Sequence, residues 1–460
     1  MAQQNTGNQS LLSKARDFFS WRRWDATQDS VGRNAVVVVP AATDAKKEFT
    51  SGDRKTLLRL ARYLRDNLGV TAGIITEMSR YSVGSNVMLQ AQTTDENWNE
   101  QAEEYFRGWS ESADITGRYS FGQLVDLWCQ AMVGEGEVFA VKANVQDEIK
   151  LQTILSHAID WKSDDYTDGI RYDSFGRPTR YRMASGRTLN AAAVRHIMEP
   201  RPNRLRGVPG IAHAANNLFD LRDILSFEKQ GVKLNSAIAA VVKRANSSNS
   251  SGNRFLGHAN KFVQEDTILT LEQVLGGAQI PQIGLQDDVK IHQSDKTSPT
   301  FQGFLEWLIR DMAVGFGMPY EFVWSAEKLQ GTAQRFIMSK AQRRFEQIQT
   351  TFEPHITDIY RTVISRAIEA GQLPFNQQWG RCEWIWPKAA TVDFGRESRE
   401  ERENIKAGIK SLKEHFAELQ KDWRTEMRQI ASEKAELAEM GLSVFENNGI
   451  DNLDTEDLED

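Results

Sequence analysis

The chain has 460 residues, of which 40% are hydrophobic and 26% are charged, as is usual for a folded protein with several domains. The formal net charge is −7, although residues 1–80 hold 13 Lys and Arg against 8 Asp and Glu. A mostly acidic chain is not a conventional DNA-gripping module, because tight binding to phosphates needs many clustered cations. The chain has only two cysteines, which excludes a disulfide framework. No stretch is long and apolar enough to cross a bilayer, and we find no secretory signal within the first 30 residues. We therefore expect synthesis in a reducing cytoplasm.

The first 30 residues form an N-terminal arm with a short amphipathic segment at residues 11–24. Its basic neighbours, Arg22 and Arg23, allow contact with an anionic membrane surface, and its short length favours docking on a protein. Residues 36–39 are predicted to form a strand, and an apolar stripe at residues 57–68 predicts a helix that closes near Gly69.

Residues 31–205 are interpreted as one α+β domain. Aromatic residues at helical spacing predict two further helices, and alternating apolar residues predict strands and one hairpin around Gly176 and Pro178. These segments are helices near residues 98–109 and 121–128, strands at 137–143 and 149–155, and the hairpin at 170–183.

Residues 206–210 break the chain, and residues 211–244 then predict one helix about 50 Å long, since each helical residue rises 1.5 Å. A polar, low-complexity segment begins at Ala245, and short strands are predicted within residues 260–295.

A second pair of helices is predicted on either side of a loop. Ser298 and Pro299 favour a helix start, and an apolar stripe follows from Phe301 to Phe316. An irregular passage at residues 320–332 separates it from a second stripe at 337–367. Pro354 lies inside that stripe and is predicted to kink the helix without ending it.

The second of these helices is locally basic. Arg335, Lys340, Arg343 and Arg344 are accompanied only by Glu346. Taken alone, such a run favours an ordinary solvated helix face over a surface that meets anions, and only the rest of the chain favours the second interpretation.

The remainder is predicted to be a strand at residues 382–387, which rejoins the first domain, followed by charged helices. Ser411 with Glu414 matches a capping box, and Asp422 and Gly441 mark the start and end of a helix. The last ten residues hold six acids and are predicted to form a solvated tail.

No arrangement of residues indicates catalysis. The seven histidines lack metal-ligand spacing, and neither a phosphate-binding loop nor a nucleophile elbow is present. We therefore predict a protein that is not an enzyme and that holds no cofactor and no metal.

The order of these elements resembles the lambda-type portal proteins of tailed bacteriophages. The segments that carry this resemblance occur in the expected order, at residues 57–67, 134–137, 169–181, 206–209, 317–321 and 392–412, with Glu433, Gly441 and Leu442. The resemblance implies a multi-domain, ring-forming α+β portal fold. The implied parts are an N-terminal arm (1–30), wing (31–205), first stem helix (206–245), clip (246–297), second stem helix (298–319), tunnel loop (320–332), kinked tunnel helix (333–372), wing return (373–395), and helical crown with acidic tail (396–460).

The resemblance also implies a dodecameric ring at a capsid vertex of the virion, through which double-stranded DNA is packaged and ejected without regard to its sequence. The implied partners are the terminase large subunit, the major capsid protein and a head-completion or adaptor protein. Trp324, Lys328, Gln330 and Arg335 are the predicted channel and tunnel-loop residues, with Trp324 favoured as an anchor of the loop. Lys340, Arg343 and Arg344 are predicted to face the channel or a neighbouring subunit.

Two other hypotheses remain at the level of the sequence. One is a peripheral membrane-associated scaffold that uses the N-terminal amphipathic segment, and sedimentation with liposomes separates it from a portal, which is expected to stay in the supernatant. The other is an enzyme with an unfamiliar site, which a cluster of titratable residues in a pocket would favour.

Overall fold

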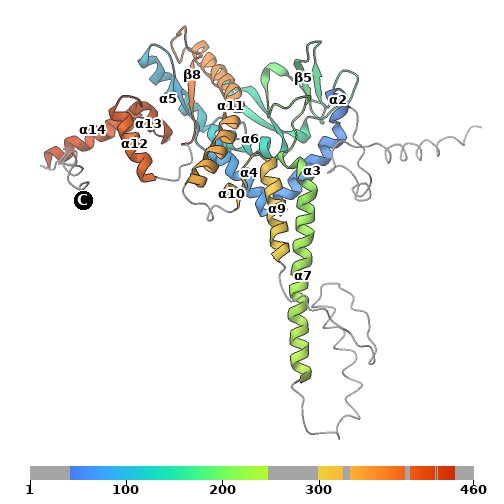
Figure 1. The fold of residues 1–460 in the computed structure, drawn as a ribbon. Helices are drawn as coiled ribbons and strands as arrows, with labels where there is room; N and C mark the ends of the chain where they lie inside the picture. The colour runs from blue at the N-terminus through green and yellow to red at the C-terminus, as the bar shows by residue number, and fades with distance from the viewer. Residues whose placement is uncertain are drawn as a thin grey trace, which may run out of the picture. The chain divides into compact units, whose positions relative to one another are not determined.

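The computed structural model describes residues 42–246, 299–324, 332–388, 394–419, 421 and 423–440 (Figure 1). The chain divides into two units, one made of Met1–Ala212 with Ala313–Asp460 (unit 1) and the other of His213–Met312 (unit 2). Several predicted features lie outside the described residues, namely the N-terminal amphipathic segment, the strand at 36–39, the insertion after residue 246, Lys328, Gln330, Asp422 and the acidic tail.

The described part of unit 1 begins at residue 42 with the helices α2 (Ala45–Glu48), α3 (Ser51–Asn67) and α4 (Gly69–Ser82). Thr50 starts α3 with a capping box, in which its side chain accepts from the amide of Asp53 and the carboxylate of Asp53 accepts from the amide of Thr50. The predicted helix at residues 57–68 is confirmed. The chain turns at Leu68 and continues as α4, a helix that the sequence pattern did not predict.

Helices α5 (Glu96–Glu111) and α6 (Phe121–Glu135) confirm the two predictions made from aromatic spacing. Their buried rings meet in one cluster with residues from distant parts of the chain. Phe106 contacts Phe121 with ring centroids 5.5 Å apart, and it also contacts Tyr360 and Trp384. This aromatic core joins the N-terminal helices to elements that lie more than 200 residues later.

The described residues of unit 1 also form three small antiparallel sheets. The first has the order β3-β2-β7, with β2 (Glu137–Val145) between β3 (Glu148–Leu155) and β7 (Val194–Met198). The second has the order β4-β5-β6, formed by β4 (Ile170–Tyr172), β5 (Pro178–Arg182) and β6 (Thr188–Asn190). The predicted strands and the hairpin at residues 170–183 are therefore confirmed, as is the mixed α+β fold class. Short 3₁₀ turns are η3 (Ser156–Ala158), η4 (Ala191–Ala193) and η5 (Gly210–His213).

The third sheet pairs the two ends of unit 1. Strand β1 (Met88–Ala91) lies antiparallel to β8 (Cys382–Ile385), with Met88 opposite Ile385. Trp384 on β8 also donates from its indole nitrogen to Thr357 Oγ1 at 2.9 Å. The prediction that this late strand rejoins the first domain is confirmed.

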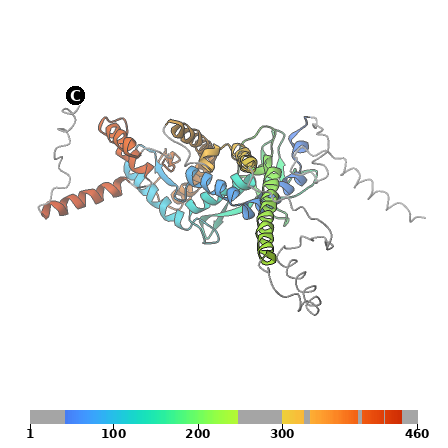
Figure 2. The same ribbon diagram turned by 60° about the horizontal axis from the view of Figure 1, so that its bottom comes forward.

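The part of unit 2 that the structure describes consists of helices. The first is α7 (Ala215–Asn246), which is continuous through Gly231 as predicted and can be followed in both ribbon views (Figures 1 and 2). The second is α9 (Pro299–Gly315), which starts where Ser298 and Pro299 predicted and whose last residues lead back into unit 1. Asn217 Nδ2 donates to Asp311 Oδ2 at 2.7 Å and so links α7 to α9.

After α9, a one-turn helix, α10 (Tyr320–Val323), occupies the start of the passage that was predicted to be irregular. Helix α11 (Thr332–Glu369) follows and runs through Pro354 without ending, as predicted. The C-terminal helices are α12 (Phe394–Lys406), α13 (Leu412–Glu418) and α14 (Trp423–Glu439). Ser411 Oγ accepts from the amide of Glu414, one half of the predicted capping box. A helix long and apolar enough to cross a membrane does not occur among the residues described.

Candidate functional site

Helix α11 is held firmly by unit 1, and this anchoring fixes the position of its basic N-terminal half. Lys142 on β2 donates from Nζ to Asp358 Oδ2 at 2.6 Å and to Thr362 Oγ1 at 2.9 Å. Arg195 on β7 forms a second ion pair with Asp358, also at 2.6 Å. Buried apolar residues of α11, among them Phe345, Phe352 and Ile356, complete the contact with the core.

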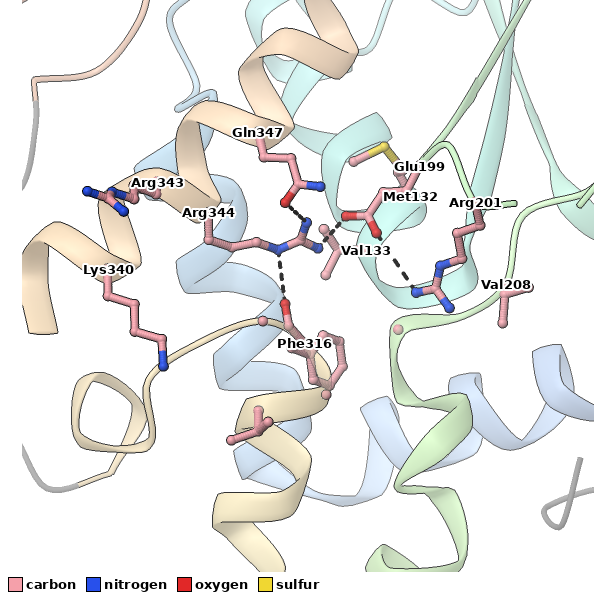
Figure 3. Close-up of a pocket in the computed structure, with 14 residues that line it drawn as sticks. Met132, Val133, Glu199, Arg201, Val208, Phe316, Lys340, Arg343, Arg344 and Gln347 are labelled. Atoms are coloured by element: carbon pink, nitrogen blue, oxygen red, sulfur yellow. Dashed lines mark hydrogen bonds and ion pairs between the residues drawn. The ribbon is translucent and has the colours of Figure 1, made fainter. Parts of the chain in front are cut away.

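The basic face of α11 divides into two kinds of cation. Arg335, Lys340 and Arg343 are exposed to solvent. Neither Lys340 nor Arg343 has a hydrogen-bond or ion-pair partner within the described part of the chain. Figure 3 shows that Arg343 points away from Glu199, whereas Arg344 points toward it.

Arg344 is only 13% exposed and is engaged by its own chain. Its Nε donates to the carbonyl oxygen of Phe316 at 3.0 Å, and its Nη1 donates to Gln347 Oε1 at 3.0 Å. Its Nη2 forms an ion pair with Glu199 (Figure 3). Sequence reasoning grouped Arg344 with its exposed neighbours because a charge pattern does not reveal a partner 145 residues away.

A cavity of about 360 Å³ lies beside these contacts, entirely within unit 1. The three cations Lys340, Arg343 and Arg344 all line it, together with Arg201 and Glu199. The structure thus brings the three predicted residues together in one basic pocket. Glu199 and Arg201 were not predicted, and no sequence pattern distinguishes them.

The chain that enters the predicted tunnel loop is anchored by aromatic rings. Phe322 on α10 contacts both Tyr81 on α4 and Phe345 on α11, at centroid distances of 5.4 Å and 5.7 Å, and those two rings stack on each other. Trp324 follows at 51% exposure and lines a second cavity of about 240 Å³ with Gly73 and Met78 of α4. This placement is compatible with the predicted anchoring role of Trp324. Of the other predicted loop residues, Arg335 lies in the first turn of α11, while Lys328 and Gln330 are outside the described residues.

Two of the segments that carried the family resemblance, residues 134–137 and 206–209, meet in the core. Arg206 Nε donates to Glu137 Oε1 at 2.9 Å, and the amide of Gly207 donates to Glu137 Oε2 at 2.8 Å. Glu137 is fully buried and Arg206 is 3% exposed. Burial alone would raise the pKa of Glu137, but Arg206 and His196 outweigh it and hold this pKa well below its ordinary value.

The glycines of these segments allow that contact. A Cβ atom on Gly207 would lie 2.1 Å from the carbonyl oxygen of Gly136, and Gly136 itself has a φ of +93°. The glycines of the two segments permit the two backbones to approach closely.

His355 makes stability depend on pH. Burial, followed by the nearby charges of His196 and Arg195, lowers the pKa of His355 on α11 from 6.5 to about 4, while Asp358 opposes the shift. Between these two pH values the unfolded chain binds more protons at this residue than the folded chain does. The free energy of unfolding therefore keeps its full value above pH 6.5 and decreases as the pH falls toward 4, by about 3 kcal/mol in total from this residue.

We therefore expect urea midpoints measured from pH 7.5 down to pH 4.5 to fall less steeply for His355→Gln than for the wild type. Parallel curves for the two proteins would refute this assignment. Glu137 also loses stabilising contacts in acid, but only below its ordinary pKa of 4.5. Burial lowers the pKa of His157 as well, and this residue is present in both proteins, so the difference between the two curves reports on His355.

Within the ranges the structure describes, no three His, Cys, Asp or Glu residues are arranged to hold a metal ion. The site that the structure does define is a helix with exposed cations and an anchored loop entrance. Exposed cations attract anions by charge alone, and such attraction does not depend on nucleotide sequence.

A comparison with known families gives this site its context. Residues 32–349 match the profile described as phage portal protein, lambda family, which is more than half of the chain. The chain belongs to the lambda family of phage portal proteins. The resemblance drawn from the ordered sequence segments is confirmed.

Individual relatives are distant. The chain is 22% identical over 181 residues to portal protein B of Escherichia phage lambda, covering 36% of this chain and 34% of that protein. It is 20% identical over 272 residues to the portal protein of Escherichia phage N15, covering 54% of this chain and 51% of that protein. The chain thus spans between about a third and about half of the length of these relatives.

Solved structures with a similar chain include the neck of an empty gene transfer agent (GTA) particle computed with C6 symmetry. The TM-score is 0.43 at 14% identity, and the match covers 80% of this chain and 94% of that one. A chain from the virion of a native gene transfer agent particle gives a TM-score of 0.40 at 13% identity, covering 78% and 89%.

Proposed function

We propose that copies of this chain form a ring at one vertex of a viral capsid and that double-stranded DNA passes through it during packaging and ejection. The family match across residues 32–349 carries this proposal. The role is structural rather than enzymatic. The proposed location is the virion, after synthesis in the host cytoplasm.

Exposed apolar side chains support assembly into a ring. Phe227 on α7 is 70% exposed, Trp307 on α9 is 54% exposed, and Phe336 on α11 is 72% exposed. Large apolar groups that remain in water on several helices favour contact with another protein surface. A head-to-tail interface that is repeated by rotation closes into a ring and leaves a central opening, whereas a two-fold interface closes at once.

The net negative charge of the chain is compatible with a channel through which DNA passes. A net charge of −7 limits the attraction of the channel wall for phosphates, and the cations of α11 supply local contacts. The proposed channel and tunnel-loop residues are Trp324, Lys328, Gln330 and Arg335, and we add Lys340 and Arg343 on the strength of their exposure. The proposed regions keep the boundaries predicted from the sequence, with wing, stem, clip, tunnel loop and crown in that order.

The proposed partners follow from the same family membership. They are the terminase large subunit, the major capsid protein and a head-completion or adaptor protein, with twelve copies of the chain in the ring. Native mass spectrometry of the purified full-length chain tests the assembly. We expect one closed species of about twelve copies, as the family resemblance implies, and a monomer at all concentrations would contradict the proposal.

The cations of α11 give a functional prediction. In the double variant with Lys340→Glu and Arg343→Glu, rings are expected to form, while DNA packaging falls by at least about ten-fold, because each copy turns two positive charges into negative ones along the DNA path. Packaging is measured as nuclease-resistant DNA in capsids assembled with each variant.

The matched control carries the same charge change on other helices of unit 1, with Arg80→Glu on α4 and Arg107→Glu on α5, whose side chains are 68% and 54% exposed. This control is expected to package DNA normally. Equal losses in both double variants would show that net charge matters and that α11 has no special role.

A further inference from the structure

Arg344 contacts three separate segments through one guanidinium group (Figure 3). Gln347 belongs to α11 itself. Phe316 belongs to residues 313–318, which lead out of unit 2, and Glu199 is the first of residues 199–212, which lead into it. The two chain connections that bound unit 2 are therefore tied to α11 at a single side chain.

The junction around this side chain is closely packed. Gly317 has a φ of +79°, and a Cβ atom there would lie 3.1 Å from Cδ and Nε of Arg344. A Cβ atom on Gly210 would lie 2.7 Å from the ring of Phe316. The two connecting segments thus contact each other. Because Gly317 has no side chain, the side chain of Arg344 can pass beside it and contact both segments.

The chemistry of the contacts requires arginine. A planar guanidinium offers five donors in fixed directions, so it can serve a carbonyl, an amide and a carboxylate at once. An ammonium group has one centre of charge and cannot span these acceptors. The carbonyl of Phe316 lies one residue beyond the end of α9 and accepts its hydrogen bond from Arg344.

We propose that Arg344 is a positioning residue that makes α11 and both connections of unit 2 move as one body. Displacement of the exposed cations Arg335, Lys340 and Arg343 would then be transmitted to residues 199–212 and 313–318. The idea that DNA displaces these cations rests on the proposed function. The mechanical link through Arg344 does not.

Hydrogen exchange measured by mass spectrometry tests the link, because both connections contain protected amides. The amides of Gly317 and Met318 donate to Val314 and Ala313 at 2.9 Å, and the amide of Ala212 donates to Pro209 at 3.0 Å. Exchange rates of the variants Arg344→Lys and Arg344→Met are compared with those of the wild type, each as the full chain. Arg343→Lys and Arg343→Met are the matched controls on the adjacent, exposed cation.

In Arg344→Lys we expect exchange to rise about ten-fold at both connections, since a charge-assisted hydrogen bond is lost at each. Peptides from β2 and α5 are expected to stay unchanged, as are all peptides of the Arg343 variants. Should Arg344→Met fail to fold, Arg344→Lys still decides the question.

Three results overturn the proposal: a change confined to α11 or to one connection, a uniform rise that includes β2, or no change at all. The oligomeric state of every variant is recorded in parallel. A wild-type chain that forms no ring contradicts the proposed function, yet the comparison of exchange at the two connections remains readable.

Discussion

Arg206→Met is expected to destabilise unit 1 by about 3–5 kcal/mol, because it leaves the carboxylate of Glu137 buried without its countercharge. Glu137 is fully buried, and besides Arg206 it accepts hydrogen bonds from Ser156 Oγ at 2.6 Å and from the amide of Gly207. The remaining donors are neutral or, in the case of His196, charged only when protonated. The measurement is urea unfolding at fixed protein concentration, since assembly alters apparent stability.

Two controls separate this effect from the loss of any ion pair. Arg177→Met removes an exposed pair with Asp173, in which the arginine is 82% exposed, and is expected to cost less than about 1 kcal/mol. The double variant with Arg206→Met and Glu137→Leu removes both buried charges and is expected to be more stable than Arg206→Met alone. A loss for Arg206→Met that is no larger than for Arg177→Met would show that the buried pair is not important for stability.

Gly207→Ala is expected to prevent folding or to cost more than about 4 kcal/mol, which single substitutions rarely do. The added methyl carbon would lie 2.1 Å from the carbonyl oxygen of Gly136 and 2.6 Å from Cβ of Glu137, and neither backbone can withdraw without breaking the contact of Glu137 with Gly207. The amount of folded protein and the urea midpoint are the measurements.

Gly231→Ala on α7 is the matched control. No atom lies within 4 Å of the Cβ position at Gly231, and this residue is inside a helix, so alanine is expected to stabilise by roughly 0.5–1 kcal/mol. If Gly207→Ala instead unfolds at the wild-type midpoint, residues 134–137 and 206–209 do not approach each other as described.

Local patterns predicted most of the regular elements. The apolar stripes of α3, α5, α6 and α11 and the alternation in β2, β3 and the β4–β5 hairpin are visible within single windows. Helix α4 was missed because Gly69 resembles a helix stop. Tertiary burial of Ile74, Ile75 and Met78 outweighs that signal, and the chain resumes its helix after one extended residue, Leu68.

The features that define the site depend on contacts between distant residues, which explains what the sequence could not predict. Arg344 has the same local setting as Arg343, yet one is paired with Glu199 and the other is exposed. Glu137 and Arg206, separated by 69 positions, form a buried pair that charge patterning treats as two ordinary surface residues. The sequence predicts a feature that depends on a local pattern. It does not predict an ion pair that forms only when two distant segments meet.

The most direct test of the proposed role is a cryo-electron microscopy reconstruction of the purified full-length chain. The expected result is a closed ring with a channel wide enough for a DNA duplex and with the N-terminal half of α11, including Lys340 and Arg343, at its wall. A reconstruction without a central opening, or one in which this half of α11 lies on the outer surface of the ring, would contradict the account.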